Sequence, residues 1–139
     1  MKRLAYILSI LGLLFTFPHN VNATRQVRDI IMIDKVEHRL NKVLLYQLDS
    51  VTYDALGKKL DFSKSSFSGC WRGHISTFEV KGNKLYLNCI ATSKVHTDFK
   101  GMLDQYKDRK GRVFASWVSD TLICVTGECL HAEPDGLFP

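Results

Sequence analysis

The sequence predicts an α+β fold: a mostly antiparallel sheet built from hairpins, with one or two packed helices and disulfide bonds. Two turn dipeptides, Gly82-Asn83 and Thr126-Gly127, each lie between segments of strand-like composition, as in β-hairpins. A third segment, 97–110, repeats its apolar residues at helical spacing. The chain has 139 residues, of which 45% are hydrophobic and 24% charged. These values suit one globular domain and exclude disordered and polytopic membrane proteins.

Residues 1–23 have the pattern of a secretory signal peptide. Lys2 and Arg3 precede an uncharged apolar run at 4–17, which a proline ends before a small-x-small-like cleavage site. The run is too short to span a bilayer comfortably, so an uncleaved N-terminal anchor is the less favoured alternative. We expect a single domain over 24–139, no stable membrane anchor after cleavage, and a periplasmic or secreted location.

Removal of the signal peptide lowers the net charge. Two of the 19 Lys and Arg residues leave and all 14 acidic residues stay, so the charge falls from +5 to +3. The remaining cations are scattered, and their densest run, 107–112, is interrupted by Asp108. Nucleic-acid-binding proteins need a concentrated basic surface. We therefore expect no nucleic-acid partner.

The first half of the domain begins with a β-branched apolar run at 29–33, which predicts a buried strand. Two interpretations of 34–50 compete. Capping-box and helical-spacing patterns favour a helix, whereas a strand–turn–strand through Lys35 before a helix fits as well. A helix over 42–50 is favoured, and 61–69 is predicted to be a polar loop.

The first predicted hairpin pairs 74–80 with 84–90 around Gly82-Asn83. In a two-residue hairpin the facing pairs are Val80 with Leu85, Phe78 with Leu87, and Ser76 with Cys89. These six residues form one largely apolar face. The opposite face, which carries Tyr86, is mixed in polarity and predicted to be half covered.

A helix is predicted next, begun by Thr97 or Asp98 and ended by Gly111. Its apolar stripe consists of Phe99, Met102, Leu103 and Tyr106. Strand character then returns at 112–118. The second hairpin is predicted to pair 121–125 with 128–131.

The four cysteines of an exported chain predict disulfides. If Thr126-Gly127 is a two-residue loop, Cys124 lies opposite Cys129, where Cα atoms about 4.5 Å apart suit a disulfide. A three-residue loop would shift this register. Cys70 with Cys89 follows only by elimination. A straight strand would separate them by roughly 20 Å, so the chain would have to bend back, and two free buried cysteines are the alternative. The spacing lacks the Cys-x2-Cys pairs of zinc sites, so we expect no metal or other cofactor.

The sequence contains no catalytic motif, such as Gly-x-Ser-x-Gly or His-Glu-x-x-His. One enzymatic alternative is a small nuclease-like hydrolase. His74 and His131 would transfer protons beside the cation Arg72, provided that the two hairpins converge. Glu79 with Glu128 as a glycosidase pair is weaker still.

Trp71-Arg72-Gly73 stands at the entrance of a predicted strand. We expect Trp71 and Trp117 to fill the core of a small domain. Arg72 is the better contact residue, because an arginine on an apolar face cannot stay unpaired. Arg72, His74 and Tyr86 are the predicted ligand-binding residues, and no residue is predicted to be catalytic.

Several motifs resemble those of a group of small, mostly uncharacterised bacterial proteins. The matching segments are Cys70-Trp71-Arg72-Gly73, Thr77-Phe78-Glu79, Leu85-Tyr86-Leu87, Ala115-Ser116-Trp117-Val118-Ser119 and Gly127-Glu128-Cys129-Leu130. Some members of that group are immunity-like proteins that neutralise a toxin. His74 stands where the group has an aromatic residue, and Asp120 where it has Gly. The end at Pro139 indicates a shortened C-terminus, and the resemblance implies no catalytic residue.

Together these observations predict an exported, non-enzymatic bacterial envelope protein that binds a protein or envelope ligand, in the manner of an immunity protein or inhibitor. The alternatives are the nuclease-like hydrolase and an envelope structural or assembly factor. Composition and motifs leave the oligomeric state open.

Overall fold

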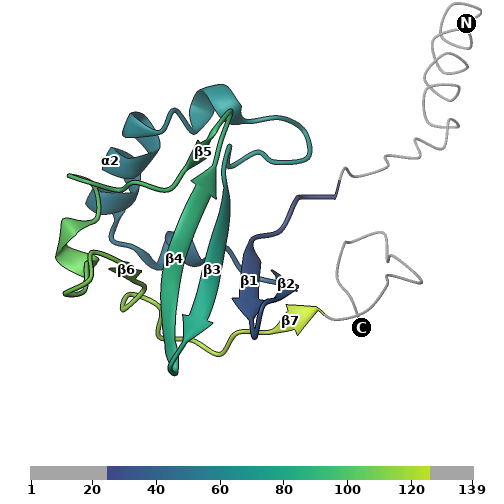
Figure 1. The fold of residues 1–139 in the computed structure, drawn as a ribbon. Coiled ribbons are helices and arrows are strands. Elements are labelled where there is room, and N and C mark those ends of the chain that lie inside the picture. Colours follow the sequence, from purple (N-terminus) through teal and green to yellow (C-terminus); the bar gives the residue numbers. More distant parts are fainter. Residues whose placement is uncertain (1–24, 126–139) are drawn as a thin grey trace, which may run out of the picture. The chain divides into compact units, whose positions relative to one another are not determined.

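Strands dominate the part of the chain that the computed structural model describes, residues 25–125, and form one sheet of mixed direction (Figure 1). The strand order is β5-β4-β3-β1-β2-β7, and β6 also pairs with β4. The strands are β1 (Ile30–Ile33), β2 (Val36–Leu40), β3 (Ile75–Lys81), β4 (Lys84–Ala91), β5 (Val95–His96), β6 (Val113–Phe114) and β7 (Cys124–Val125). The helical segments are η1 (Leu44–Gln47), α2 (Ser50–Lys59), η2 (Ser63–Ser65) and η3 (Asp104–Tyr106). A sheet with one α-helix in the described range confirms the α+β class; the predicted signal peptide lies outside that range.

The ambiguous segment after the first strand forms a hairpin. β1 and β2 are antiparallel, and the turn residues Asp34 and Lys35 both have positive φ, 49° and 67°. The strand–turn–strand alternative is therefore correct. The favoured helix over 42–50 is wrong, because only the short 3₁₀ turn η1 forms there and α2 begins at Ser50. Asp49 begins α2 by accepting a hydrogen bond from the Thr52 amide at 2.9 Å.

The β3–β4 hairpin is confirmed, with Gly82 and Asn83 at positive φ in its turn. Val80 faces Leu85 and Phe78 faces Leu87 as predicted. Beyond these pairs the register shifts, so that Cys89 faces Thr77 while Ile90 faces Ser76. The predicted Ser76–Cys89 pair is wrong because one extra residue in β4, Asn88, forms a bulge.

The predicted helix over 97–110 is absent, and only η3 is helical in that range. Gly101 has φ +72°, and its amide donates to the Asp104 carboxylate at 3.0 and 3.1 Å. The Asp98 carboxylate accepts a hydrogen bond from the Lys100 amide at 2.9 Å. These local side-chain-to-backbone hydrogen bonds compete with the backbone hydrogen bonds of an α-helix. Phe99 and Leu103 are nevertheless buried, so the apolar spacing identified core residues but not their conformation.

The C-terminal strands are shorter than predicted. The strand expected at 112–118 is reduced to β6, and β7 pairs with β2 through Leu40 and Cys124. The rest of the second predicted hairpin lies outside the described residues. Within residues 25–125 no helix has the length and apolar character needed to cross a membrane.

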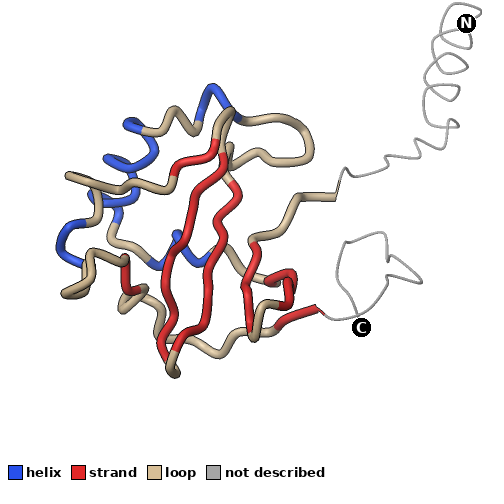
Figure 2. The backbone as a smooth tube through the Cα atoms, viewed as in Figure 1, coloured by secondary structure: helices blue, strands red, loops and turns tan. Residues whose placement is uncertain are grey.

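The core lies on the face of the sheet that carries Phe78, Leu87 and Ile90. Helical turns are gathered toward one side of the long β3–β4 pair (Figure 2), and α2 contributes the buried Leu56 to this core. β1 joins the sheet through parallel pairing with β3, Ile31 facing Phe78. This pairing brings residues 26–29, which precede β1, beside the segment that precedes β3.

Candidate functional site

Two consecutive tight turns precede β3 and form a loop of residues 67–73, here called the aromatic loop. The Cys70 amide donates to the Phe67 carbonyl at 2.8 Å, and the Phe67 amide donates to the Cys70 carbonyl at 3.2 Å. The Gly73 amide also donates to the Cys70 carbonyl, at 3.0 Å. Trp71 and Arg72 are the two central residues of that second turn. The turn directs the Trp71 side chain toward solvent and the Arg72 side chain toward the interior.

The exposure of these two neighbours is the reverse of what the sequence predicted. Trp71 is 76% exposed, so its prediction as a core residue is wrong. The Arg72 side chain, predicted to contact a ligand, is only 7% exposed. Phe67 is 57% exposed on the same loop. The aromatic side chains, and not the arginine, are therefore what this loop presents to solvent.

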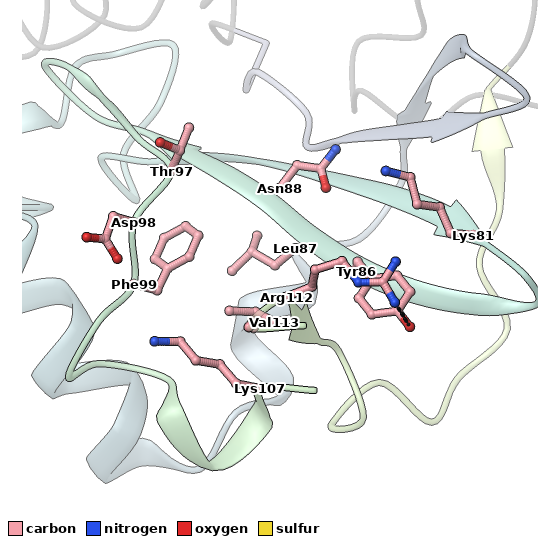
Figure 3. Close-up of a pocket in the computed structure, with 11 residues that line it drawn as sticks. Lys81, Tyr86, Leu87, Asn88, Thr97, Asp98, Phe99, Lys107, Arg112 and Val113 are labelled. Carbon is pink, nitrogen blue, oxygen red and sulfur yellow. Dashed lines mark hydrogen bonds between the residues drawn. The ribbon is translucent and has the colours of Figure 1, made fainter. Parts of the chain in front are cut away.

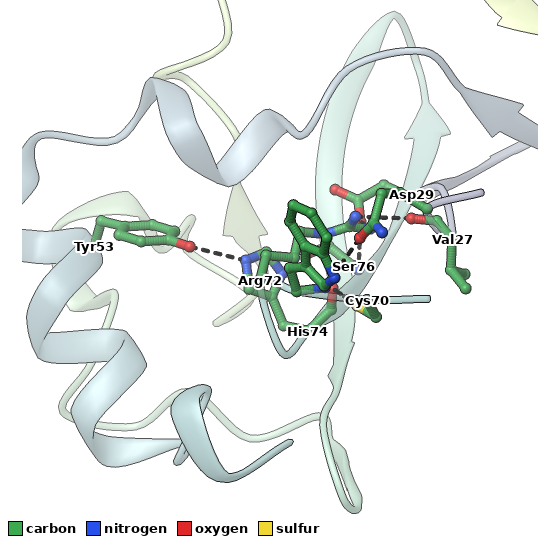
Figure 4. Close-up of polar contacts among 9 residues, drawn as sticks. Val27, Asp29, Tyr53, Cys70, Arg72, His74 and Ser76 are labelled. Atoms are coloured by element: carbon green, nitrogen blue, oxygen red, sulfur yellow. Dashed lines mark hydrogen bonds and ion pairs between the residues drawn. The ribbon is translucent and has the colours of Figure 1, made fainter. Parts of the chain in front are cut away.

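Arg72 is buried because it has an acidic partner, Asp29, directly before β1. Its Nη2 donates to Asp29 Oδ1 at 2.8 Å, and its Nη1 donates to the Val27 carbonyl at 2.7 Å. Asp29 Oδ1 also accepts from the Ser76 amide at 3.0 Å (Figure 4). Burial raises the pKa of Asp29, while the Ser76 amide and Arg72 oppose that rise. The ion pair thus ties the segment before β1 to the C-terminal end of the aromatic loop and to β3.

His74 lies beside this ion pair and is 1% exposed. Its ring packs 4.3 Å from the ring of Phe62, and its Nε2 lies 3.1 Å from the hydroxyl of Tyr53 (Figure 4). Burial, and then the positive charge of Arg72, lower the pKa of His74 to about 3. Burial also raises the pKa of Tyr53. His74 is therefore neutral at physiological pH, and Tyr53 keeps the proton that it can donate to Nε2.

The segment before β1 also bonds to the backbone of the aromatic loop. The Gln26 side chain donates to the Ser68 carbonyl at 2.7 Å and accepts from the Trp71 amide at 3.0 Å. The Val27 amide donates to the Gly69 carbonyl at 2.7 Å. Because the contacts include backbone atoms of Ser68, Gly69 and Trp71, the loop is held along its length and not only at its ends.

Gly73 ends the loop at a point where no side chain fits. Its φ is +72°, and an added Cβ would lie 1.7 Å from the carbonyl oxygen of Phe62. Such a separation is impossible without a backbone shift, since the obstacle is main chain. The Trp71-Arg72-Gly73 motif therefore contains one exposed aromatic residue, one buried cation and one backbone position that only glycine can occupy.

Tyr86, the third predicted ligand-binding residue, lies elsewhere. It pairs with Glu79, five residues along β3 from His74, a separation of about 16 Å. The predicted half-covered position is wrong for Tyr86, which is 5% exposed: Arg112 lies 4.2 Å above its ring, and Phe114 pairs with it from β6. The structure therefore brings Arg72 and His74 together and leaves Tyr86 apart.

A pocket of about 260 Å³ lies next to Tyr86 (Figure 3). Its floor includes Leu87, Phe99 and Val113. Its cations are Lys81, Lys107 and Arg112, and each already pairs with an acidic residue: Glu79 at 2.9 Å, Asp104 at 2.6 Å and Asp108 at 2.7 Å, respectively. The pocket therefore offers no uncompensated charge to an anionic ligand.

Three cysteines lie in the described range, and no disulfide joins any two of them: Cys70, Cys89 and Cys124. No bond joins Cys70 to Cys89 within residues 25–125, and the pairing predicted by elimination stays a prediction. Cys70 Sγ donates to the His74 carbonyl at 3.3 Å, and the bulge turns Cys89 with Thr77 to the opposite face from Ser76. Cys129 lies outside the described residues, so its pairing with Cys124 stays a prediction.

The groups required by the enzymatic alternatives are not assembled within residues 25–125. Arg72 and His74 are buried, so a phosphate cannot reach them in this conformation. His131, the proposed partner of His74, and Glu128, the proposed partner of Glu79, lie outside the described range. Within that range no three His, Cys, Asp or Glu side chains are close enough to hold a metal ion.

Comparison with known proteins gives no relative: no protein-family model, no curated protein and no solved structure matches the chain. The resemblance to small bacterial proteins therefore stays a hypothesis that depends on the motif residues alone. Any function must be argued from the geometry of the aromatic loop and its supports.

Two residues important to this site, Asp29 and Gln26, were not among the predicted site residues. One signal for Asp29 was present: a buried arginine requires an acidic partner, and Asp29 stands directly before a strand of apolar residues. Nothing in the sequence pointed to Gln26, because its role depends on the parallel pairing of β1 with β3.

Trp117 was predicted correctly as a core residue; it is half-buried, and its indole nitrogen donates to the Leu44 carbonyl at 3.1 Å.

Proposed function

We propose that this chain is an exported, non-enzymatic binding protein of the bacterial envelope, and that it contacts its protein or envelope ligand through the aromatic loop. The observation that carries the proposal is the 76% exposure of Trp71 on a loop whose backbone bonds to Gln26 and whose Arg72 pairs with the buried Asp29. An indole left in water forgoes the stabilisation that burial of its large apolar surface would give. A binding partner that covers it would recover that stabilisation.

The construction of the loop supports a binding role more strongly than exposure alone. Isolated apolar residues on a surface are common. Here the Gln26 side chain and the Val27 amide hydrogen-bond to the loop backbone. Arg72, a residue of the loop, donates in turn to the Val27 carbonyl. A loop whose backbone is already held in place loses little backbone conformational entropy on binding, which favours affinity.

The proposal changes which residues make contact. Arg72 and His74 are buried and support the loop, whereas the exposed side chains of Trp71 and Phe67 contact the ligand. An immunity- or inhibitor-like role fits this arrangement, since such proteins bind through a few central aromatic residues. Tyr86 belongs to a separate pocket whose charges are already paired.

Export is the second part of the proposal and depends on the sequence of residues 1–23. In an oxidising compartment the Cys124–Cys129 pair would form a disulfide. That bond would close the predicted hairpin immediately after β7.

Capture from an envelope extract tests the proposal. The exported protein, its Trp71→Ala variant and its Val36→Ala variant serve as baits. Val36 is 55% exposed and begins β2 opposite Ile33, the last residue of β1, about 20 Å from Val27. We expect a specific ligand to be retained by the wild-type protein and by Val36→Ala, and lost with Trp71→Ala. Equal retention by all three proteins would contradict a role for the aromatic loop.

A further inference from the structure

We infer that a polar corner of the core, formed by Asp29, His74 and Ser76, binds internal water. The inference goes beyond the proposed function and does not depend on what the aromatic loop contacts. Its basis is three buried polar atoms that have no hydrogen-bond partner among residues 25–125: Asp29 Oδ2, His74 Nδ1 and Ser76 Oγ. The residues that carry these atoms are each 1% exposed or less.

Strand pairing brings the three residues to one place in the core (Figure 4). Asp29 Oδ1 accepts a hydrogen bond from the Ser76 amide at 3.0 Å, so the second oxygen of the same carboxylate also lies close to Ser76. The buried His74 and Ser76 flank the half-buried Ile75. Alternate residues of an extended chain point to the same face, so both side chains point into the core beside Asp29.

The three atoms together need both a donor and an acceptor. The Tyr53 hydroxyl lies 3.1 Å from His74 Nε2, and when it donates to that nitrogen the neutral ring carries its proton on Nδ1. Nδ1 then needs an acceptor, whereas Asp29 Oδ2 needs a donor and Ser76 Oγ can take either role. Water donates and accepts at the same time, and buried waters typically bind to such unpaired polar groups.

The charges of the cluster select a neutral ligand. Asp29 is paired with the Arg72 guanidinium at 2.8 Å, so a cation would meet the guanidinium and an anion would meet the carboxylate. Burial lowers the pKa of His74 and keeps its ring neutral as well. The core encloses all three residues, so the ligand must also be small. Water satisfies each of these conditions.

Internal water also extends the hydrogen-bonded support of the aromatic loop. His74 bonds to Tyr53 in α2, and Asp29 bonds to Arg72 in the loop. Arg72 Nε is a further buried donor for which the described part of the chain offers no acceptor. Water held among these groups links α2 to the loop, so that the helix stabilises the loop together with the segment before β1.

Crystallography and oxygen-17 relaxation dispersion test the inference on the exported protein. A crystal structure that resolves ordered water should place a water oxygen about 2.7–3.2 Å from at least two of the three atoms. Relaxation dispersion counts the waters that stay bound far longer than surface water. We expect the double variant His74→Phe with Ser76→Val to hold at least one such water fewer than the wild type, because apolar side chains replace two of the three partners.

Ser116→Ala is the control, since Ser116 is exposed, and it should leave the count of bound water unchanged. A crystal structure in which protein groups pair directly with the three atoms would overturn the inference, as would a count that the double variant leaves unchanged. If far-UV circular dichroism shows that the double variant does not fold, Ser76→Val alone replaces it. The capture assay with Trp71→Ala decides the proposed function separately, so either proposal can fail without the other.

Discussion

Trp71 and Arg72 are adjacent in the chain, yet the first is 76% exposed and the side chain of the second is 7% exposed. The turn closed by the Gly73 amide on the Cys70 carbonyl produces this division. The buried arginine bonds to Asp29 and Val27, and the exposed indole stands on the backbone that those bonds hold in place. Under the proposed function, Arg72 supports the fold and Trp71 contacts the ligand, so stability and binding can be altered separately.

The first prediction concerns the buried ion pair. Arg72→Met should lower the free energy of unfolding by about 3–5 kcal/mol, because it leaves Asp29 buried without its cation. Lys42→Met is the control, since Lys42 pairs with Asp120 at the surface and should cost about 1 kcal/mol or less. Urea unfolding measures both. The double variant Asp29→Asn with Arg72→Met should recover part of the loss, and equal effects of the two single variants would show that the buried pair has no special role.

A second prediction tests the glycine that ends the aromatic loop. Gly82→Ala should cost about 1–2 kcal/mol, because its φ is positive but no atom lies within 4 Å of an added Cβ. Gly73→Ala should cost distinctly more, since the added carbon would meet the Phe62 carbonyl as well. Thermal and urea unfolding of the two variants give the comparison. A cost at Gly73 no greater than at Gly82 would mean that the loop has another conformation.

The third prediction follows from His74. Its pKa is about 3 in the folded protein and about 6.5 when unfolded, so the unfolded chain takes up the proton first as the pH falls. Stability should therefore decrease from about pH 6.5 downward, by up to about 1.4 kcal/mol per pH unit. Asp29 acts in the opposite direction: its raised pKa makes the folded state bind a proton before the unfolded state does.

Urea unfolding at a series of pH values measures this effect. The slope just below pH 6.5 should disappear in His74→Phe, which keeps a ring against Phe62. It should persist, or become steeper, in Asp29→Asn, where the opposing contribution is removed. A wild-type stability that does not change between pH 7 and pH 5 would contradict a buried neutral histidine.

A fourth prediction concerns the cysteines. The non-reduced exported protein should be lighter than its reduced form by about two hydrogens, corresponding to the Cys124–Cys129 bond alone. The β4 bulge turns Cys89 to the face opposite Ser76, so Cys70 and Cys89 should remain thiols. Cys89 is half-buried and should react with a thiol reagent before Cys70, which is 1% exposed. A loss of about four hydrogens would show that Cys70 and Cys89 are joined.

The sequence predicted those features of the fold that depend on residues close together in the chain. The β3–β4 hairpin was predicted because Gly82-Asn83 adopts the positive φ values that its turn requires. The helix over 97–110 was predicted wrongly because Phe99, Met102, Leu103 and Tyr106 keep helical spacing, while Asp98 and Asp104 bond to nearby amides instead. Apolar spacing indicates which residues are buried and cannot by itself fix the backbone between them.

The candidate site required long-range information. Whether Arg72 points inward depends on Asp29, which is 43 residues away along the chain, and their proximity depends on the parallel pairing of β1 with β3. The sequence does not predict this parallel pairing. The local hairpin that β1 forms with β2 does not indicate which strand pairs with the other edge of β1. The Trp-Arg-Gly motif was therefore identified as important, while the roles of its tryptophan and arginine were interchanged.

The most direct test of the aromatic loop as the binding site is photo-crosslinking of the exported protein in cells. A photoreactive phenylalanine analogue is placed at position 71, at position 67 or, as the control, at position 36. Adducts with lipid or with one protein should form at positions 71 and 67 and be absent at position 36. No adduct at position 71, or equal adducts at positions 71 and 36, would contradict the proposal that Trp71 makes the contact.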